Sequence, residues 1–221
     1  IETILINGAE CEPYCTADNR TMVEDAEHIK QGIEILKRFA GSKEYVIGIE
    51  ENKPEAIAHL TEVFKDDPAV IVKPLKSVYP QGAKQVLLWN ATGKVVAAGQ
   101  RLASLGVIIT NVTTLAKMAR FFETGMPLVD KCISVDGSAV KNPKNIIVPI
   151  GTSMEYCFEQ CGGFKTQPGR VLDGGPMMGR AVASLDEPVV KATSALVAMD
   201  LKDSVVIEPT ACLHCGKCVE A

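Results

Sequence analysis

The stretch Thr3-Ile4-Leu5-Ile6-Asn7-Gly8-Ala9-Glu10 decides the fold, because an apolar run of strand length passes directly into a polar turn that contains glycine. Apolar residues then recur at three- and four-residue steps, which predicts a helix that ends near Gly41. These residues are Met22, Ala26, Ile29, Ile33 and Leu36. In a sheet of parallel strands, ligands bind beyond the carboxyl ends. We therefore expect Asn7–Tyr14 to form a ligand-binding loop.

The alternation of strands and helices continues to about residue 126. Each further apolar run is followed by a helical segment with its own start signal, such as Pro54 or Asn111. The expected strands are Tyr45–Ile49, Ala69–Val72 and Val107–Thr110. Three helices are expected: one that starts at Asn52-Lys53-Pro54, one over residues 81–89, and one that begins at Asn111. This order implies an α/β domain over residues 1–130 with a parallel sheet and right-handed crossovers.

From about Lys131 the pattern changes to short strands around an Asp136-Gly137 turn. The expected elements are strands at Cys132–Val135 and Asn145–Pro149 and one helix at Ser153–Cys161. We expect a small α+β module at residues 131–165. Residues 166–208 then connect it onward through the glycine-rich loop Gly174–Gly179 and a helical or extended apolar stretch at 188–199.

Three of the eight cysteines, Cys212, Cys215 and Cys218, are separated by gaps of two residues. This spacing is typical of a cubane iron–sulfur cluster. A structural zinc site or unliganded thiols are the alternatives. Bacterial ferredoxins continue such a run with three residues, another cysteine and a proline, so we expect residues 209–221 to begin a ferredoxin-type segment whose fourth cysteine follows Ala221.

Composition excludes several classes of function. The formal net charge is −4 and no basic stripe is present, which argues against binding of nucleic acid. No apolar run reaches the roughly 18–20 residues that a membrane-spanning helix needs. A cysteine pattern of this kind in a chain of this length favours a reducing, cytoplasmic setting over a disulfide scaffold.

Two strand tips carry the candidate binding residues. Asn7 and Glu10 offer hydrogen-bonding groups that suit ribose or ribityl hydroxyls, although a plain polar turn is an equal alternative. Thr110, Asn111 and Thr114 stand where a strand meets a helix, which suits a phosphate, although simple N-capping by Asn111 also explains them. The residues Cys11 and Cys15 are expected to be buried thiols, and His28 and His59 to face solvent.

Five separated motifs, in this order along the chain, resemble the C-subunit family of Rnf-type electron transport complexes. These motifs are Asn7–Tyr14, Tyr79–Lys84, Val140-Lys141-Asn142-Pro143, Gly174–Gly179 and the terminal cysteines. That family is part of the broader family of the flavin-carrying, NADH-oxidising subunit of respiratory complex I. Corrinoid reductases and electron carriers associated with proline reductase share the same layout, so these remain alternatives.

The resemblance implies an α/β domain that binds FMN and exchanges hydride with NADH, and a soluble-ligand-binding β-grasp module at 131–165. It also implies [4Fe–4S] clusters ligated from Cys212, Cys215 and Cys218, with ferredoxin as the other redox partner. By position, Asn7, Glu10 and Asn111 match flavin-contacting residues, with Thr110 and Thr114 as weaker candidates. Glu12 matches a carboxylate near the nicotinamide nucleotide.

The resemblance further implies partner subunits that hold the protein at the inner face of the cell membrane. Two departures from the family stand out. The glycine-rich nucleotide loop of the family is expected before Ile1, so that cofactor binding would be incomplete without it. Ala83 and Lys84 occupy positions that are acidic in complex I, which leaves the electron donor and the direction of flow open. A non-catalytic scaffold that binds a ligand through its β-grasp module is the alternative from another functional class.

Overall fold

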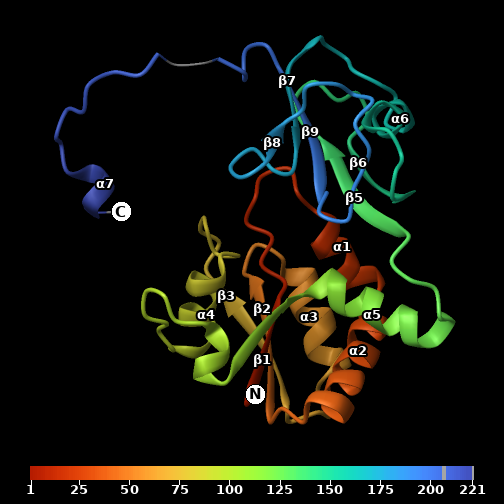
Figure 1. The fold of residues 1–221 in the computed structure, drawn as a ribbon, viewed down its shortest axis with the longest axis vertical. Helices are drawn as coiled ribbons and strands as arrows, with labels where there is room; N and C mark the ends of the chain where they lie inside the picture. Colours follow the sequence, from red (N-terminus) through yellow and green to blue (C-terminus); the bar gives the residue numbers. More distant parts are fainter. Residues whose placement is uncertain (206–207, 221) are drawn as a thin grey trace.

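The computed structural model describes residues 1–205 and 208–220 and places them in two α/β units joined by a short linker (Figure 1). The first unit contains a four-stranded sheet in the order β3-β2-β1-β4. Its strands are β1 (Thr3–Asn7), β2 (Glu44–Glu50), β3 (Val70–Leu75) and β4 (Val107–Asn111). Its helices are α1 (Ala17–Glu24), α2 (Ala26–Ala40), α3 (Pro54–Val63), α4 (Lys84–Thr92) and α5 (Val112–Thr124), with a 3₁₀ helix at Leu102–Leu105.

All pairings in this sheet are parallel, as the sequence predicts. Asn7 at the end of β1 is in register with Gly48 of β2 and Asn111 of β4. The two polar segments that the sequence singles out therefore leave the sheet side by side, at the same edge.

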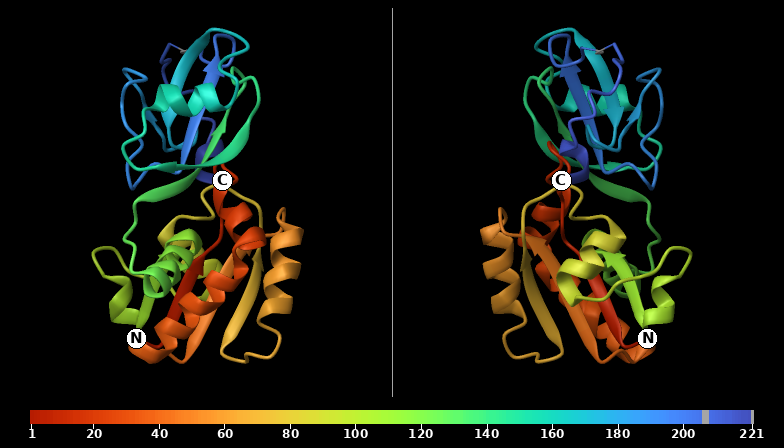
Figure 2. Two further views of the ribbon diagram at one scale, coloured as in Figure 1. Left: turned by 90° about the vertical axis from the view of Figure 1, so that its right-hand side faces the viewer. Right: turned by 90° about the vertical axis from the view of Figure 1, so that its left-hand side faces the viewer.

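Helices cover both faces of the sheet (Figure 2). Ile4 and Ile6 of β1 pack in a core with residues of α2, α3 and α5, while Leu5 packs on the other face against Leu87 and Leu88 of α4. Alternate residues of β1 thus enter different cores, which explains why the strand is apolar throughout.

The first helix of the prediction differs from the structure. The apolar repeat from Met22 to Leu36 spans two helices, because the chain breaks at Asp25, which lies between α1 and α2 with a φ of −129°. Two capping predictions are confirmed, since Gly41 ends α2 in the left-handed conformation and the Asn111 side chain accepts a hydrogen bond from the Thr114 amide. The helix expected from residue 81 begins at Lys84, and α3 begins at Pro54 with Lys53 as its N-cap residue.

The second unit has a five-stranded sheet in the order β6-β5-β9-β7-β8, packed against helix α6 (Met154–Gln160). Its strands are β5 (Asp130–Asp136), β6 (Lys144–Pro149), β7 (Pro168–Asp173), β8 (Arg180–Ala181) and β9 (Ala195–Asp200). The apolar stretch at 188–199 therefore ends in an extended strand. Because β9 lies between β5 and β7, the division that we expected at residue 165 falls inside one sheet.

The cysteine-rich segment lies apart from both units and contains the short helix α7 (Lys217–Glu220) (Figure 1). Residues 206, 207 and 221 of the expected connecting and ferredoxin-type segments lie outside the described residues. Within the described parts of the chain, no helix combines the length and the apolar character that a membrane crossing requires.

Candidate functional site

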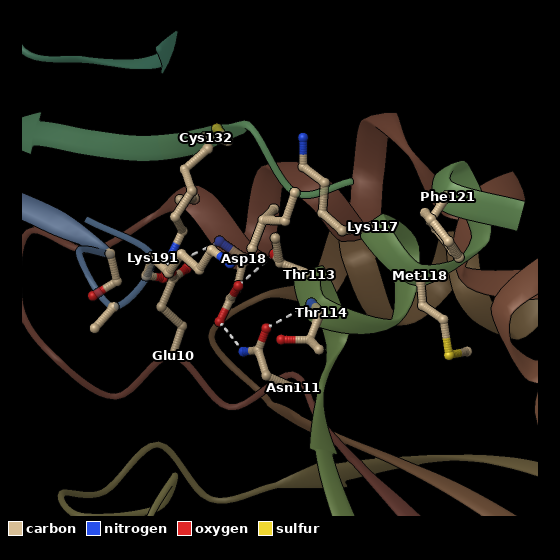
Figure 3. A pocket seen from close by; sticks show the side chains of 15 residues that line it. Glu10, Asp18, Asn111, Thr113, Thr114, Lys117, Met118, Phe121, Cys132 and Lys191 are labelled. Carbon is tan, nitrogen blue, oxygen red and sulfur yellow. Dashed lines mark hydrogen bonds between the residues drawn. The ribbon is translucent and has the colours of Figure 1, made fainter. Parts of the chain in front are cut away.

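A cavity of about 490 Å³ opens between the two units, beyond the carboxyl ends of β1 and β4 (Figure 3). Its wall combines a polar end from the strand tips, an apolar strip from α5 and a group of lysines. The lining residues are Glu10, Ala17, Asp18, Asn111, Thr113, Thr114, Lys117, Met118, Phe121, Leu128, Lys131, Cys132, Lys191, Ala192 and Ser194. Three of the six predicted binding residues, Glu10, Asn111 and Thr114, are among them.

Asn7 lies at the tip of β1 and uses its side chain to hold neighbouring loops together. Its Nδ2 donates to the carbonyl of Gly82 at 3.1 Å, and its Oδ1 accepts from the amide of Ala9 at 3.1 Å. A Cβ at Gly82 would come within 3.0 Å of the Ala9 carbonyl, so glycine permits this close approach. The motif that contains Tyr79–Lys84 is thereby fixed against the first strand tip.

Glu10 lies next to the amino end of α1 and accepts hydrogen bonds from two of its amides. Asp18 N donates at 2.9 Å and Asn19 N at 3.1 Å. Desolvation by burial raises the pKa of Glu10 to about 7. Glu10 is thus a residue of the cavity wall whose carboxyl group gains or loses its proton near neutral pH.

Asn111 is held by two hydrogen bonds at the start of α5. Its Oδ1 caps the helix through the amide of Thr114 at 3.1 Å, and its Nδ2 donates to Asp18 Oδ2 at 2.7 Å. Thr114 lines the cavity, whereas Thr110 lies one position before Asn111, half-buried in β4 and in register with Ile6. The carboxyl of Asp18 therefore joins α1 to the strand tip of β4.

Glu12 connects the first strand tip to the glycine-rich loop of the second unit. Its Oε2 accepts from the amide of Met177 at 2.9 Å, and a Cβ at Gly175 would come within 2.6 Å of the Glu12 Cβ. Its Oε1 is buried and has no hydrogen-bond partner in the described part of the chain. A neighbouring cavity of about 340 Å³ is lined by Glu12, Tyr79 and Met178 together with Asn7 and Glu10. The free oxygen of Glu12 is available to a donor in this region.

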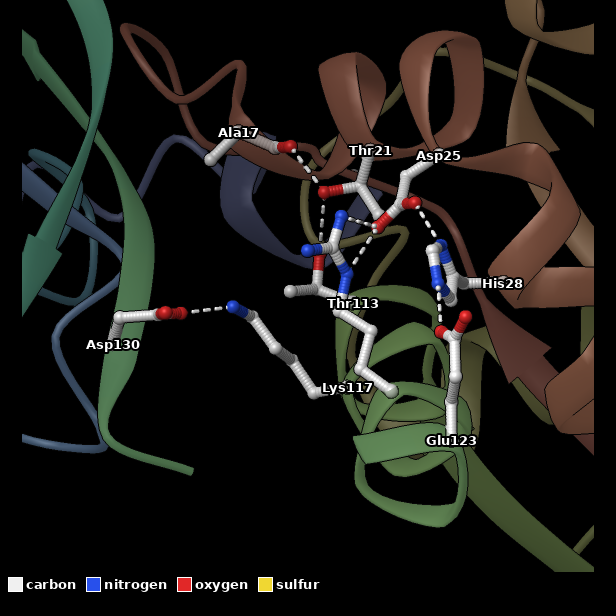
Figure 4. Close-up of polar contacts among 9 residues, drawn as sticks. Ala17, Thr21, Asp25, His28, Thr113, Lys117, Glu123 and Asp130 are labelled. Atoms are coloured by element: carbon white, nitrogen blue, oxygen red, sulfur yellow. Dashed lines mark hydrogen bonds and ion pairs between the residues drawn. The ribbon is translucent and has the colours of Figure 1, made fainter. Parts of the chain in front are cut away.

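Polar contacts from α5 and from the residue before α1 join the first unit to the second beside the cavity; Figure 4 shows the contact from α5. Lys117 forms an ion pair with Asp130 at the start of β5. Ser134 of β5 accepts a hydrogen bond from the amide of Thr16 at 2.8 Å. These contacts hold the lysine-bearing wall over the strand tips.

Sequence reasoning missed Asp18, Lys117 and Lys131, which also line the cavity. Asp18 lies in the first turn of α1, where acidic residues are common because they interact favourably with the helix dipole. Its residue type and position therefore did not mark it as a residue of a binding site. Lys131 is half-buried, and its Nζ donates to the carbonyl of Lys191 at 2.7 Å. Desolvation by burial lowers the pKa of Lys131.

The cysteines divide into two groups. Cys212, Cys215 and Cys218 are exposed, and no three His, Cys, Asp or Glu side chains among residues 1–205 and 208–220 are grouped as metal ligands. The described arrangement thus does not fit the expected cluster. Cys11 and Cys15 are half-buried near the strand tip, and burial followed by the charges of Glu10 and Glu12 raises the pKa of Cys15 to about 12. Cys15 is therefore a protonated thiol at neutral pH.

The two histidines of the first unit also differ from each other. His59 is exposed, as expected. His28 is half-buried because its ring lies between the carboxylates of Asp25 and Glu123, as Figure 4 shows. The expectation that His28 faces solvent is therefore wrong, since the side chain connects α2 to α5.

Comparison with known proteins gives matches along the whole chain. The chain is 39% identical over 219 residues to the C-subunit of the Na(+)-translocating ferredoxin:NAD(+) oxidoreductase complex of Acetobacterium woodii, covering 99% of this chain and 49% of that protein. It is 37% identical to the C-subunit of the proton-translocating ferredoxin:NAD(+) oxidoreductase complex of Clostridium ljungdahlii, covering 100% of this chain and 48% of the relative. The chain thus spans about half the length of these curated relatives.

A solved NAD+-reducing [NiFe]-hydrogenase in the air-oxidized state has a similar fold, with a TM-score of 0.74 and 17% identity over 91% of this chain and 41% of that one. The family model for the SLBB domain matches residues 132–181, which covers β5 to β8 of the second unit. The family model for the Nuo51 FMN-binding domain matches residues 1–120, more than half of the chain and all elements of the first sheet. The chain therefore belongs to the Nuo51 FMN-binding domain family, with an SLBB domain following in the same polypeptide.

Proposed function

We propose that this chain binds FMN in the cavity between its two units and transfers electrons between NAD(H) and ferredoxin as part of an ion-translocating membrane complex. The observation that carries the proposal is the convergence of Glu10, Asn111 and Thr114 on one cavity at the carboxyl edge of a parallel sheet. The names of the relatives from Acetobacterium woodii and Clostridium ljungdahlii support the two redox partners.

The residues present fit a flavin mononucleotide. A cavity of about 490 Å³ lies within the range usual for small-molecule sites, and its apolar strip of Met118, Phe121 and Leu128 suits a ring system. Lys117, Lys131 and Lys191 supply positive charge for a phosphate. The unpartnered Oε1 of Glu12 adds an acceptor for a hydroxyl or amide donor nearby.

Bound FMN would supply the ability to take up two electrons as a hydride and to release them singly. The protein itself provides binding and orientation. Asn111 and Thr114 hold the polar end of the cavity, the lysines balance negative charge, and Asn7 fixes the Tyr79–Lys84 loop over the strand tip. Thr110 is a weaker proposed contact to FMN, because Thr110 does not line the cavity although its neighbour Asn111 does.

We assign Glu12 to the nicotinamide nucleotide. Its carboxylate is anchored on one side by the Met177 amide and keeps its other oxygen unpartnered within the described residues. The exposed side chains of Tyr79 and Met178 stand at the same cavity, where an aromatic ring can pack. Glu12 and the glycine-rich loop would then set the position of the donor relative to the flavin.

The iron–sulfur proposal rests on the spacing of Cys212, Cys215 and Cys218 alone. A cubane takes four ligands, and this run supplies three. We propose no electron step through it. Anaerobic reconstitution followed by iron and sulfide analysis tests the assignment, and Cys215→Ser should lower the iron content while Cys157→Ser in the core of the second unit should not.

We propose a peripheral position at the inner face of the membrane, held by partner subunits. The names of the relatives support the partner subunits, because they describe a subunit of a translocating complex. Co-purification of the chain with membranes that contain those subunits, and its release when they are absent, tests the proposal.

The central test of function is an FMN titration of the chain, read by quenching of flavin fluorescence. Asn111→Ser keeps an N-cap acceptor but removes the amide donor, and we expect it to weaken FMN binding roughly tenfold. Asn52→Ser, an exposed asparagine on the same unit, is the matched control. Saturable binding that supports NADH-dependent dye reduction agrees with the proposal, whereas a chain that takes up no flavin contradicts it.

A further inference from the structure

Asp18 has a hydrogen-bonding environment that the proposed function does not explain. Its Oδ2 accepts from Asn111 Nδ2 at 2.7 Å, and its Oδ1 lies 2.6 Å from the hydroxyl of Thr113 (Figure 3). Both partners belong to the junction of β4 and α5. The carboxyl thus holds the polar end of the cavity in place.

A count of protons shows which form of Asp18 fits. The hydroxyl of Thr113 has one proton but lies within hydrogen-bond distance of both Asp18 Oδ1, at 2.6 Å, and Thr21 Oγ1, at 3.0 Å. The single proton of Thr21 is directed to the carbonyl of Ala17 at 2.9 Å, as Figure 4 shows. An ionised Asp18 leaves one of these contacts without a proton.

A protonated Asp18 satisfies all of them. The acid donates to Thr113, Thr113 donates to Thr21, and Thr21 donates to the Ala17 carbonyl, while the other carboxyl oxygen still accepts from Asn111. The chain of donors then ends on a backbone acceptor with no contact unpaired.

The charged groups around Asp18 favour the same form. Glu10 faces it from the β1 tip, and two amides donate to the Glu10 carboxyl group, so that Glu10 is the better placed of the two acids to carry a negative charge. Lys53 from the start of α3 donates to Glu10 O, Glu50 and Asn52, and Lys131 of β5 donates to a carbonyl. Cys15, on the loop before α1, is a neutral thiol at neutral pH. Neither lysine bonds Asp18 within the described residues.

We propose that Asp18 keeps its proton in the folded protein at neutral pH and acts as a positioning residue for Asn111 and Thr113, leaving that wall of the cavity without a negative charge. The free energy cost of desolvation is also smaller for a neutral acid than for a carboxylate. For the flavin, this inference rests on the proposed function: an uncharged Asp18 avoids repulsion of a bound phosphate. The protonation itself is independent of any ligand.

The direction of the titration supports the geometry. Burial raises the pKa of Asp18, against the hydrogen bonds from Thr113 and Asn111. A carboxyl with a raised pKa takes up a proton on folding, so it favours the folded state at low pH, and this contribution is lost as the pH rises through the folded-state pKa. Asp18→Asn, whose amide donates to Thr113 while its oxygen accepts from Asn111, imitates the protonated acid at every pH.

The decisive experiment compares wild type, Asp18→Asn, Asp18→Ala and the exposed control Asp66→Asn. Infrared difference spectra at neutral pH should show, in addition to any band from Glu10, a protonated carboxyl band that is lost in Asp18→Asn and kept in Asp66→Asn. Denaturant unfolding at several pH values should give a stability that falls with rising pH in wild type and falls less in Asp18→Asn. Asp18→Ala should be less stable than both.

FMN titration separates this inference from the proposed function. Asp18→Asn should bind FMN within about twofold of wild type at a pH where wild type shows the protonated carboxyl band, and more tightly than wild type at a pH where that band is lost. Asp18→Ala should bind roughly tenfold more weakly at both values. If wild type takes up no flavin, the proposed function fails while the infrared and unfolding results still decide the state of Asp18. An unchanged carboxyl band in Asp18→Asn, with an unchanged pH dependence of unfolding, overturns the inference.

Discussion

Asn7, Glu10 and Asn111 direct most of their polar atoms at other parts of the chain. Asn7 holds Gly82, Glu10 accepts from the amino end of α1, and Asn111 contacts Asp18 and Thr114. At the scale of single residues, side-chain type and position at a strand tip were enough to predict where the cavity lies. They were not enough to predict Asp18, because its role follows from partners that are 93 and 95 residues away along the chain.

The contact between Gly175 and Glu12 provides a prediction at this scale. A methyl group at Gly175 would collide with the Cβ and carboxylate of Glu12, at 2.6 and 2.4 Å. We expect Gly175→Ala to displace Glu12, to break its bond to the Met177 amide and to cost about 1–3 kcal/mol of unfolding free energy. The apparent KM for NADH should rise while FMN binding changes little. Gly163→Ala is the control for backbone strain alone, because a Cβ at Gly163 meets no neighbouring atom. An equal KM for NADH in both variants would show that the contact between Gly175 and Glu12 does not influence NADH binding.

Among the elements, the strands of the first sheet and their parallel pairing were the most predictable, and helix boundaries were the least. The apolar repeat of Met22, Ala26, Ile29 and Ile33 keeps its spacing across Asp25, so periodicity could not reveal the break between α1 and α2. The break follows from contacts made by the Asp25 side chain, which binds His28 and Arg120. Such contacts depend on α5, which lies far along the chain.

Asp25→Ala should therefore destabilise the junction of α1, α2 and α5. The carboxylate is four-fifths buried and has two partners, so we expect a loss of about 1–2 kcal/mol in urea unfolding. Glu24→Ala removes the neighbouring and more exposed partner of Arg20 and should cost at most about 0.5 kcal/mol. Equal losses for the two variants would show that the break does not depend on Asp25.

In the whole molecule, the cavity lies where the two units meet, and residues of both units line it. The sequence predicted the two units and their order, but it placed the end of the second one too early. Strand β9 pairs in parallel with β5 across about sixty residues, and no local pattern reports such a partner. The contacts between the units, from Thr16 to Ser134 and from Lys117 to Asp130, were equally beyond local reasoning.

Two serines allow the joint between the units to be tested. Ser134 accepts an amide hydrogen bond from Thr16 in the first unit, and Ser138 accepts one from Asp200 within the second unit. Each change to alanine should cost about 1 kcal/mol of stability, since each orphans one amide. Only Ser134→Ala should also weaken FMN binding, by a factor of about three or more, because the wall with Lys131 is then less firmly held. Equal FMN affinities in the two variants would show that the contact between the units does not affect the FMN site.

The place of β9 in the middle of its sheet has a consequence for biosynthesis. During translation, the hairpins β5–β6 and β7–β8 emerge from the ribosome before the strand that joins them, and they cannot form one sheet until Asp200 has left the exit tunnel. The nascent second unit thus has open strand edges at a time when helix α5 of the first unit has already emerged and that unit is able to fold. A polypeptide that stopped at residue 181, where the SLBB match ends, would retain both hairpins and lack the strand that makes them a domain.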